Sequence, residues 1–385
     1  MKITNIKTFI HSPHWNLILV KIETDEGIVG WGEATTQGQE RNVEASIQNL
    51  AHYLMGKDPR HIERHWSTMF RDSFWRPSLI VTCAMSGLEI AMWDILGKSL
   101  GVPIHALLGG PCHDRIKIYH NGWWFEATSI DDYVGLAERE VKERGAKALK
   151  WDPFWGCDVF TTERADFDRI VENVGRVREV VGDDVELMLD GHGRFSPNTA
   201  IQFAHAVEKF RPSWYEEPIP IDASPEDLAR VAASTDIPIV TGERIPTRWC
   251  FRDLFEKRAV TFINPDIAHA GGILETKKIA DMAHAYYVGV TPHNSAGPIL
   301  NAASLHLDAC MPNFVTNEFF PFDLPHWNEI LVEPFPAPRD GFLDIPTKPG
   351  LGVEIDEGKL QATNRPYVYH DLSSFWRSPR QPSTG

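Results

Sequence analysis

The chain has few cysteines, and no regular spacing pairs them. It contains five in 385 residues, an odd number that leaves at least one thiol without an intramolecular partner. This pattern argues against a disulfide framework and favours free thiols in a reducing compartment. The N-terminal stretch MKITNIKTFI alternates apolar and polar residues and does not resemble the apolar core of a secretory signal. We therefore expect a cytoplasmic protein.

Long apolar runs and an excess of positive charge are also lacking. No apolar run reaches the roughly 18 residues that indicate a membrane-spanning helix, so we expect no membrane partner. The formal net charge is −15, which argues against nucleic acid and anionic membranes as partners. It does not argue against an anionic small molecule, because a metal ion and a few cations can dominate the charge of a pocket. The 43% hydrophobic content is ordinary for a soluble protein and supports a full core.

The first part of the chain has the pattern of strands followed by helices. Alternating stretches and the turn Asp25-Glu26-Gly27 predict an antiparallel meander within residues 3–31. Three helical patterns follow, at about 40–55, 60–73 and 79–100. This order is typical of an α+β module, which we place at residues 1–112.

After residue 113 short apolar runs alternate with amphipathic helical patterns. The runs lie at 116–119, 148–150, 185–189, 214–215, 237–240, 262–263, 288–291 and 314–316. Such an alternation predicts parallel βα units that close into a barrel, here over 113–330. Beyond residue 330 the rhythm is lost and prolines are frequent. We expect this C-terminal segment, 331–385, to pack back on the first module.

Ionisable residues recur directly after the predicted strands, about one every 25 residues, which suits one βα unit of a barrel. They are Asp190, Glu216, Glu243, Asp266, His293 and Glu318. Because the C-terminal strand ends of a barrel meet at one mouth, we expect these side chains to lie together. A single acid at such a position is more often a helix cap. Three carboxylates in phase repel one another unless a cation lies between them, so Asp190, Glu216 and Glu243 are candidate metal ligands.

The ligand types point to one kind of metal. All three candidate ligands offer carboxylate oxygens, and none is a cysteine or histidine. Oxygen ligands favour a hard divalent cation over zinc. We expect one Mg²⁺ per site.

Two histidines flank the expected metal. Asp266 can accept the Nδ1–H of His293 and raise the basicity of Nε2, which makes His293 a candidate base. His192 follows Asp190 by two residues, and in extended backbone such residues share a face, so His192 is a candidate acid on the opposite side. Each could instead be structural, as a hydrogen-bonded loop residue or a surface histidine.

Taken together, these residues and the segments around them resemble the mandelate racemase subgroup of the enolase superfamily over nearly the whole chain. The segments that carry the resemblance are VKIETDEGIVGWGE (20–33), GLEIAMWDILGKSLGVPIHALLGG (87–110), LDGHGRF (189–195), WYEEP (214–218), TGER (241–244), INPDIAHAGGI (263–273) and TPHNSAGP (291–298). The resemblance implies a (β/α)₇β TIM-like barrel with an α+β N-terminal capping domain completed by the C-terminal segment.

The resemblance also implies roles for single residues. An essential Mg²⁺ falls on the three acids named above, and the base dyad falls on His293 with Asp266. Glu318 falls where the family places an acid that hydrogen-bonds the substrate carboxylate, and we expect it to be protonated there. Barrels of this family are often symmetric assemblies, which implies a homo-oligomer.

One departure bears on the reaction. The family's racemases carry Lys-x-Lys after the second barrel strand, and the second lysine is a base. Here the segment is Lys150-Trp151-Asp152, so Lys150 is kept and Asp152 replaces that base, which argues against racemisation. His192 instead resembles the general-acid histidine of the galactonate dehydratase-like acid-sugar dehydratases.

We therefore expect a Mg²⁺-dependent hydro-lyase of a galactonate- or gluconate-like aldonate. His293 would remove the α-proton, Lys150 would stabilise the enolate, and His192 would protonate the departing 3-hydroxyl group. The product would be a 2-keto-3-deoxy acid. The alternative is a racemase or epimerase of an acid sugar or 2-hydroxy acid that forms the same enolate and needs a second base near Asp152.

Residues that contact the rest of the polyhydroxy carboxylate are predicted from strand ends and N-terminal loops. The candidates are Trp15, His120, Trp123, Asp152 and Arg194, with His14, Phe74, Trp75, Trp124 and Trp155 as further possibilities. Several aromatics together favour a lid that excludes water. Most tryptophans, however, are packing residues.

Overall fold

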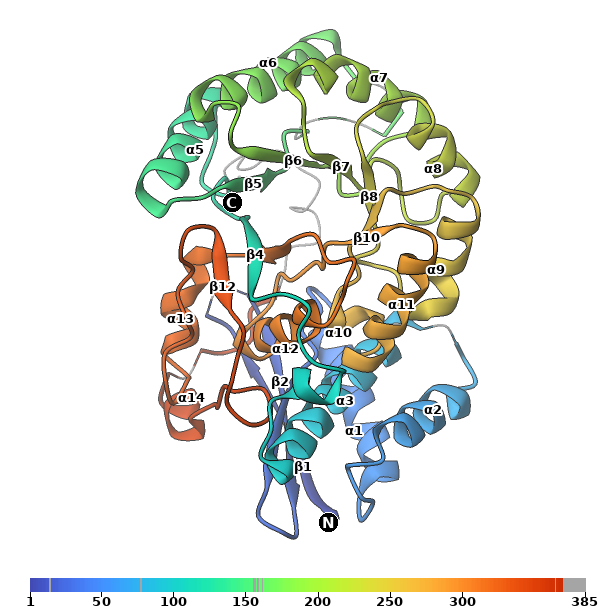
Figure 1. Cartoon of the computed structure of the whole chain (residues 1–385), viewed down its shortest axis with the longest axis vertical. Coiled ribbons are helices and arrows are strands. Elements are labelled where there is room, and N and C mark those ends of the chain that lie inside the picture. The colour runs from blue at the N-terminus through green and yellow to red at the C-terminus, as the bar shows by residue number, and fades with distance from the viewer. Residues whose placement is uncertain are drawn as a thin grey trace.

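The computed structural model describes residues 1–369 except 14, 77, 155–156, 158, 161 and 364. Within these residues the chain forms a barrel, a smaller N-terminal module and a C-terminal segment that contacts both (Figure 1). The predicted TIM-like barrel with an α+β capping domain is confirmed. The limits proposed for the three parts, at 112 and 330, stay predictions.

The N-terminal module is an antiparallel meander covered by helices. Its strands pair in the order β1 (Ile3–His11), β2 (Leu17–Thr24) and β3 (Val29–Glu33). The helices are α1 (Glu40–Leu54), α2 (Ile62–Asp72), α3 (Leu79–Leu100) and α4 (Ile104–Leu107). Glycine at position 32 lets α3 approach β3 closely, because a Cβ there would lie 1.9 Å from the carbonyl oxygen of Gly87.

Helix α3 is the core helix of this module. By length and composition alone it could cross a membrane, but most of its side chains are buried inside the protein. The Ser78 hydroxyl accepts a hydrogen bond from the Val81 N–H at its start, and Gly101 ends it in the left-handed conformation. Two carboxylates, Glu89 and Asp94, are buried along it. Its burial is that of a core helix in a globular protein.

The barrel is built from parallel strands in chain order. They are β4 (Arg115–His120), β5 (Ala148–Trp151), β6 (Glu186–Asp190), β7 (Trp214–Glu216), β8 (Ile239–Thr241), β9 (Phe262–Ile263), β10 (Gly289–Val290) and β11 (Asn317–Phe319). β11 pairs with β4, and a bridge between Val290 and Phe314 joins β10 to the segment that leads into β11. The barrel is therefore closed.

Helices cover the outside of the strands, as the arch from α5 to α9 in Figure 1 shows. They are α5 (Ile130–Arg144), α6 (Arg164–Val181), α7 (Pro197–Val207), the 3-10 turn η1 (Glu208–Phe210), α8 (Pro225–Ala232), α9 (Thr247–Glu256), α10 (Ile267–Ala270), α11 (Ile273–Ala285) and α12 (Pro298–Ala309). Local sequence sets several starts. Ser129, Ser196 and Ser224 cap α5, α7 and α8 through their hydroxyl groups. Proline in the first turn supports α7 and α8.

The C-terminal segment contacts both modules. After the 3-10 turn η2 (Pro321–Asp323) come α13 (Leu324–Asn328), β12 (Phe342–Asp344) and α14 (Glu357–Thr363). β12 adds to β4 in antiparallel fashion, and the Leu351 N–H donates to Asp94 of α3 over 2.9 Å. The segment thus reaches the barrel as well as the first module.

Two buried carboxylates of the N-terminal module cap barrel helices. Glu33 accepts hydrogen bonds from the N–H groups of Gly297 and Leu300 at the start of α12, over 2.6 and 3.0 Å. Glu89 does the same for Ile273 and Leu274 at the start of α11, over 2.8 and 3.0 Å. Neither helix has a side-chain cap of its own. These contacts fix the module on the barrel.

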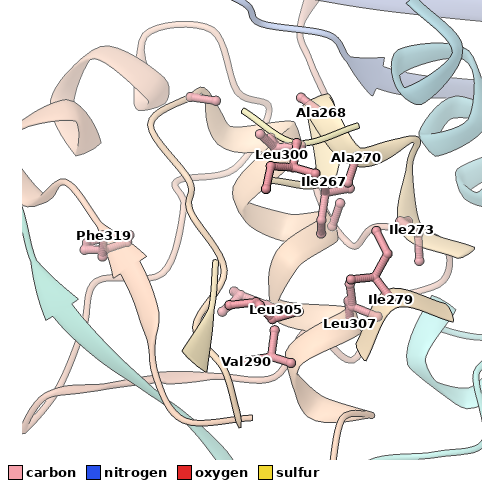
Figure 2. Packing of buried hydrophobic residues seen from close by; sticks show 14 of the residues in the cluster. Ile267, Ala268, Ala270, Ile273, Ile279, Val290, Leu300, Leu305, Leu307 and Phe319 are labelled. Atoms are coloured by element: carbon pink, nitrogen blue, oxygen red, sulfur yellow. The ribbon is translucent and has the colours of Figure 1, made fainter. Parts of the chain in front are cut away.

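An apolar cluster also joins the two modules. The side chains in Figure 2, such as Ile267 of α10 and Leu305 of α12, belong to one buried cluster that joins the barrel and the N-terminal module. This packing holds the loops after β9 and β10 in place. Two of the candidate catalytic residues, Asp266 and His293, are on those loops.

Candidate active site

Three carboxylates meet at the mouth of the barrel. Asp190 and Glu216 are the last residues of β6 and β7 and are directly paired, and Glu243 follows β8. Their ligand oxygens lie within 4.8 Å of one another, and all three side chains are buried. Carboxylates held this close repel one another, and burial together with Asp190 raises the pKa of Glu216 well above its usual range. The geometry and the all-oxygen donor set suit a hard divalent cation.

Lys150 contacts three carboxylates at the mouth of the barrel. Its Nζ lies 2.7 Å from Glu216, 2.9 Å from Glu318 and 3.3 Å from Asp190. The side chain is 1% exposed, so it needs such partners. One lysine does not offset the three carboxylates that it contacts, which favours a cation beside them.

Glu318 is held by several donors, of which Lys150 is one. Besides Lys150 it accepts hydrogen bonds from the Asn121 amide over 2.7 Å and the Asn294 N–H over 2.9 Å. Burial raises the pKa of Glu318, but Lys150 and His293 outweigh burial and lower it. Three donors favour the ionised carboxylate in this structure, and the protonated Glu318 that we expect in the substrate complex stays a prediction.

His293 and Asp266 form a dyad at the Glu243 end of the acids. The Nδ1–H of His293 donates to Asp266 Oδ2 over 2.7 Å, and the Ala268 N–H holds Asp266 Oδ1 over 2.7 Å. The Nε2 of His293 is 3.7 Å from both Glu243 and Glu318. Burial lowers the pKa of His293, but these two carboxylates outweigh burial and raise it to about 10. The contact between Nδ1 and Asp266 directs Nε2 to the mouth, where a base would lie. A cation held by Glu243 would offset the carboxylate charge that raises this pKa.

His192 is at the opposite, Asp190 end. Its Nδ1 is 3.1 Å from Asp152 Oδ2, and its Nε2 is 3.5 Å from Asp190 Oδ2. We predicted the direction of His192 from extended backbone after Asp190, and that premise was wrong. β6 ends at Asp190, and His192 has a φ of 47°. A left-handed turn, not a strand, presents this imidazole.

Asp152 and Arg194 are brought together behind His192. The Arg194 guanidinium donates to Asp152 over 2.7 and 3.4 Å, and the Phe154 N–H donates over 2.8 Å. Both side chains are buried. They therefore form a buried pair that supports His192.

The structure does not bring His120 and Trp123 into the mouth. His120 points to α5, where its Nδ1 is 3.0 Å from Glu140, and the Trp123 indole donates to the Lys150 carbonyl over 2.9 Å while packing on Trp151. Neighbouring strand residues face opposite sides of a sheet, so the residue that faces the mouth here is Asn121. Our sequence reasoning was one residue out of register.

Trp15 is on the loop between β1 and β2. Its indole contacts the Asp323 carboxyl, and its ring meets Phe125 edge to face at 5.6 Å. The N-terminal loop thus rests on the segments after β4 and β11. Phe74 and Trp75 are exposed, Trp124 donates to Asn121 over 2.9 Å, and His14 and Trp155 lie outside the described residues.

Sequence reasoning also missed polar residues around the acids. Asn264, directly after β9, donates to Glu216 over 2.7 Å. Glu217 has a φ of 37° and pairs with Arg244, and burial with the Glu243 charge raises the pKa of Glu217 to about 8. The signal was present, since Asn264 precedes Asp266 by two residues and Glu217 and Arg244 each follow a candidate ligand.

Comparisons with known proteins place this geometry in context. Residues 132–359 match the enolase C-terminal domain-like family, and residues 5–109 match the N-terminal domain of mandelate racemase and muconate lactonizing enzyme. The chain is 38% identical to D-galactonate dehydratase of Xanthomonas euvesicatoria pv. vesicatoria, over 98% of this chain and 97% of that protein. It is equally identical, with the same coverage, to D-galactonate dehydratase of Ralstonia nicotianae.

Solved structures give the same grouping. A mandelate racemase/muconate lactonizing enzyme from Sulfitobacter sp. superposes with a TM-score of 0.88 at 35% identity, covering 96% of both chains. A member of the enolase superfamily from Salmonella Typhimurium gives a TM-score of 0.89 at 31% identity, covering 94% of this chain and 97% of that one. Both similarities extend over the barrel and the N-terminal module.

Proposed function

The chain belongs to the enolase superfamily and is a hydro-lyase, and on that premise we propose that it dehydrates an aldonate to a 2-keto-3-deoxy acid with the help of Mg²⁺. The observation that carries the proposal is a pair of imidazoles whose Nε2 atoms contact different acids of one cluster. His293 is beside Glu243 and His192 is beside Asp190. Removal of a proton and protonation of a leaving hydroxyl group need two such groups on different sides of the substrate.

Asp190, Glu216 and Glu243 would hold the cation. The donor set is all oxygen, buried and net negative, which fits Mg²⁺ better than a softer metal. A bound divalent cation would stabilise the negative charge that develops on the substrate carboxylate when the α-proton leaves. Lys150, which contacts two of these ligands, would keep a fixed positive charge next to that carboxylate.

His293 would take the α-proton at Nε2. Its Nδ1–H is held by Asp266, so the ring presents Nε2 to the mouth with its orientation fixed. The C–H electron pair then becomes part of the enolate. Glu318, 3.7 Å from the same Nε2, borders the space in which the substrate carboxylate would lie.

His192 would complete the elimination from the other end. As the bond from C3 to oxygen breaks, its imidazolium form gives the Nε2 proton to the departing hydroxyl group, which leaves as water. The resulting enol tautomerises to the 2-keto-3-deoxy acid. The proton gained by His293 and the proton lost by His192 balance over the cycle after exchange with solvent.

A second candidate function is supported by one observation. His192 is paired with Asp152 much as His293 is paired with Asp266, so it could also serve as a base. An enzyme with a base on each side of the α-carbon would epimerise an acid sugar or racemise a 2-hydroxy acid. Its product would be an epimer and no keto acid.

The test is a substrate screen with the purified protein. We expect that, with Mg²⁺ in deuterated water, at least one aldonate from a library of mono- and diacid sugars yields a 2-keto acid. Formation of an epimer without keto acid would favour the second function. The absence of both products and of α-proton exchange across the library would contradict both proposals. The same screen with excess EDTA serves as the control for metal dependence.

A further inference from the structure

We propose that Asp152 and Arg194 are positioning residues that hold His192 as a second histidine–aspartate dyad, dedicated to the departure of the hydroxyl group. The inference rests on the proposed function and extends it. It replaces the direct contact with substrate that the sequence suggested for these two residues.

The two dyads share one geometry. In each, the imidazole Nδ1 lies against Oδ2 of an aspartate, at 3.1 Å for His192 and 2.7 Å for His293. In each, Oδ1 of that aspartate accepts a hydrogen bond from the backbone N–H two residues further on, at 2.8 Å for Asp152 and 2.7 Å for Asp266. This leaves both Nε2 atoms directed at the acid cluster. The repetition indicates that His192 is built for a proton transfer, as His293 is.

Backbone hydrogen bonds on both sides of His192 also fix its position. The Gly191 N–H donates to the Glu216 carbonyl over 2.9 Å, and the Gly193 N–H donates to the Glu217 carbonyl over 2.7 Å. A Cβ on Gly191 would lie 2.8 Å from the Glu217 carbonyl oxygen, so only glycine fits. These contacts impose the φ of 47° at His192. Strain of this kind persists where the surroundings require it.

Arg194 distinguishes this dyad from the first. Its guanidinium donates to both oxygens of Asp152, which is 5% exposed, and Arg194 itself is 7% exposed. A forked contact from arginine locks the carboxylate plane and supplies the partner that a buried charge requires. Asp152 therefore cannot turn away from His192, and the imidazole keeps one orientation toward the departing group.

The test uses the Mg²⁺-loaded full chain and three probes that separate the chemical steps. D-galactonate reports keto-acid formation, its 3-deoxy-3-fluoro analogue reports loss of a group that needs little protonation, and its 3-deoxy analogue reports α-proton exchange alone. We expect Asp152→Asn and His192→Gln to lower keto-acid formation from D-galactonate by about 10²-fold or more. Fluoride release and α-proton exchange should change by less than about tenfold, because neither depends on the acid.

Asp266→Asn is the matched control, because it removes the corresponding aspartate from the other dyad. It should depress all three readouts together. Equal losses on all three probes in Asp152→Asn would instead mean that Asp152 is merely structural and would overturn the inference. A second result would also overturn the inference. If the wild-type chain epimerised the 3-deoxy probe and Asp152→Asn did not, His192 would be a base.

A measurement without substrate separates this inference from the proposed function. In ¹⁵N-histidine-labelled, Mg²⁺-loaded protein, long-range proton–nitrogen spectra should show a proton on Nδ1 of His192, with His192→Gln used to assign the signal. A neutral ring with its single proton on Nε2 would overturn the dyad even if the enzyme dehydrates aldonates, whereas the imidazolium, protonated on both nitrogens, is the acid form that the dyad supports. Arg194→Lys keeps Asp152 and serves if Asp152→Asn does not fold. Arg194→Lys should shift the signal of the Nδ1 proton of His192, and it should lower keto-acid formation by a smaller factor than Asp152→Asn does.

Discussion

Buried carboxylates occur in two regions of this molecule, and their surroundings differ. At the interface between the modules, Glu33 and Glu89 each face the N–H groups at the start of a barrel helix. At the mouth of the barrel, Asp190, Glu216 and Glu243 face one another. Backbone N–H groups and the helix dipole offset charge at the interface, whereas at the mouth the charges of the acids add up.

The difference teaches that burial alone does not mark a functional acid. Burial raises the pKa of Glu89 to about 7 and that of Glu216 well above its usual range, so both sites penalise the charged form. Among the described residues of these two regions, only the mouth has several acids within reach of a single cation. The interface acids therefore serve the fold, and the mouth acids fit a metal and its chemistry.

The largest effect is expected from loss of a mouth carboxylate. In Asp190→Asn we expect turnover to fall by about 10³-fold or more, because the cation supplies several kcal/mol to the transition state. Affinity for Mg²⁺ should fall as well, measured by calorimetric titration. Without Mg²⁺ the melting temperature should stay the same or rise, because one repelling charge is gone. Unchanged Mg²⁺ affinity in this variant would contradict the assignment, and Glu89→Gln, an interface change, is the control that should bind Mg²⁺ normally.

The next effect separates the base from the metal site. His293→Asn should lower α-proton exchange in deuterated water by about 10²- to 10⁴-fold, as expected for loss of a general base. Mg²⁺ affinity should change little, because the imidazole is not among the oxygen donors. Exchange is followed by the loss of the α-proton signal in NMR spectra. If His293→Asn exchanged the proton at the wild-type rate, another group would have to be the base.

The interface is expected to respond in stability and not in catalysis. Glu89→Ala removes the partner of the Ile273 and Leu274 N–H groups and of the Trp93 indole, which is 2.7 Å away. Unsatisfied buried donors cost about 1–3 kcal/mol, so we expect a loss of about 2 kcal/mol in urea unfolding. Glu89→Gln should lose less, because its carbonyl oxygen still accepts. Turnover of the folded enzyme at 25 °C should stay within about twofold. A large loss of turnover with unchanged stability would place Glu89 in the catalytic machinery.

The sequence predicted the mouth better than the interface for a physical reason. Barrel strands repeat at a regular spacing, so residues at one phase, such as Asp190 and Glu216, must meet at the strand ends. Which residue of a strand faces the mouth was harder to predict, because a shift of one residue replaces His120 by Asn121.

No comparable rule finds the interface contacts. Glu33 lies 264 residues from Gly297, and Glu89 lies 184 residues from Ile273. No period of the chain relates these positions, and an isolated glutamate in a strand or apolar helix does not reveal which helix it will cap. Likewise, the pairing of Asp152 with His192 depends on a left-handed turn at His192 that a strand pattern does not predict.

The smallest predicted effect extends the comparison to histidines. His306 of α12 donates from Nε2 to the Leu351 carbonyl over 3.1 Å, and its Nδ1 accepts from the His105 N–H over 3.3 Å. Both nitrogens are used by the neutral ring, and burial lowers the pKa of His306 to about 4, whereas carboxylates raise that of His293 to about 10. Because the unfolded chain binds this proton near pH 6.5 and the folded chain does not, the stabilisation is complete above pH 6.5 and is lost as pH falls toward 4. Between pH 7 and pH 6 we expect His306 to account for about 0.7 kcal/mol of lost stability. The free energy of unfolding of His306→Gln, measured with urea, should therefore fall less steeply with decreasing pH than that of the wild type. Parallel curves would mean that His306 is charged in the fold.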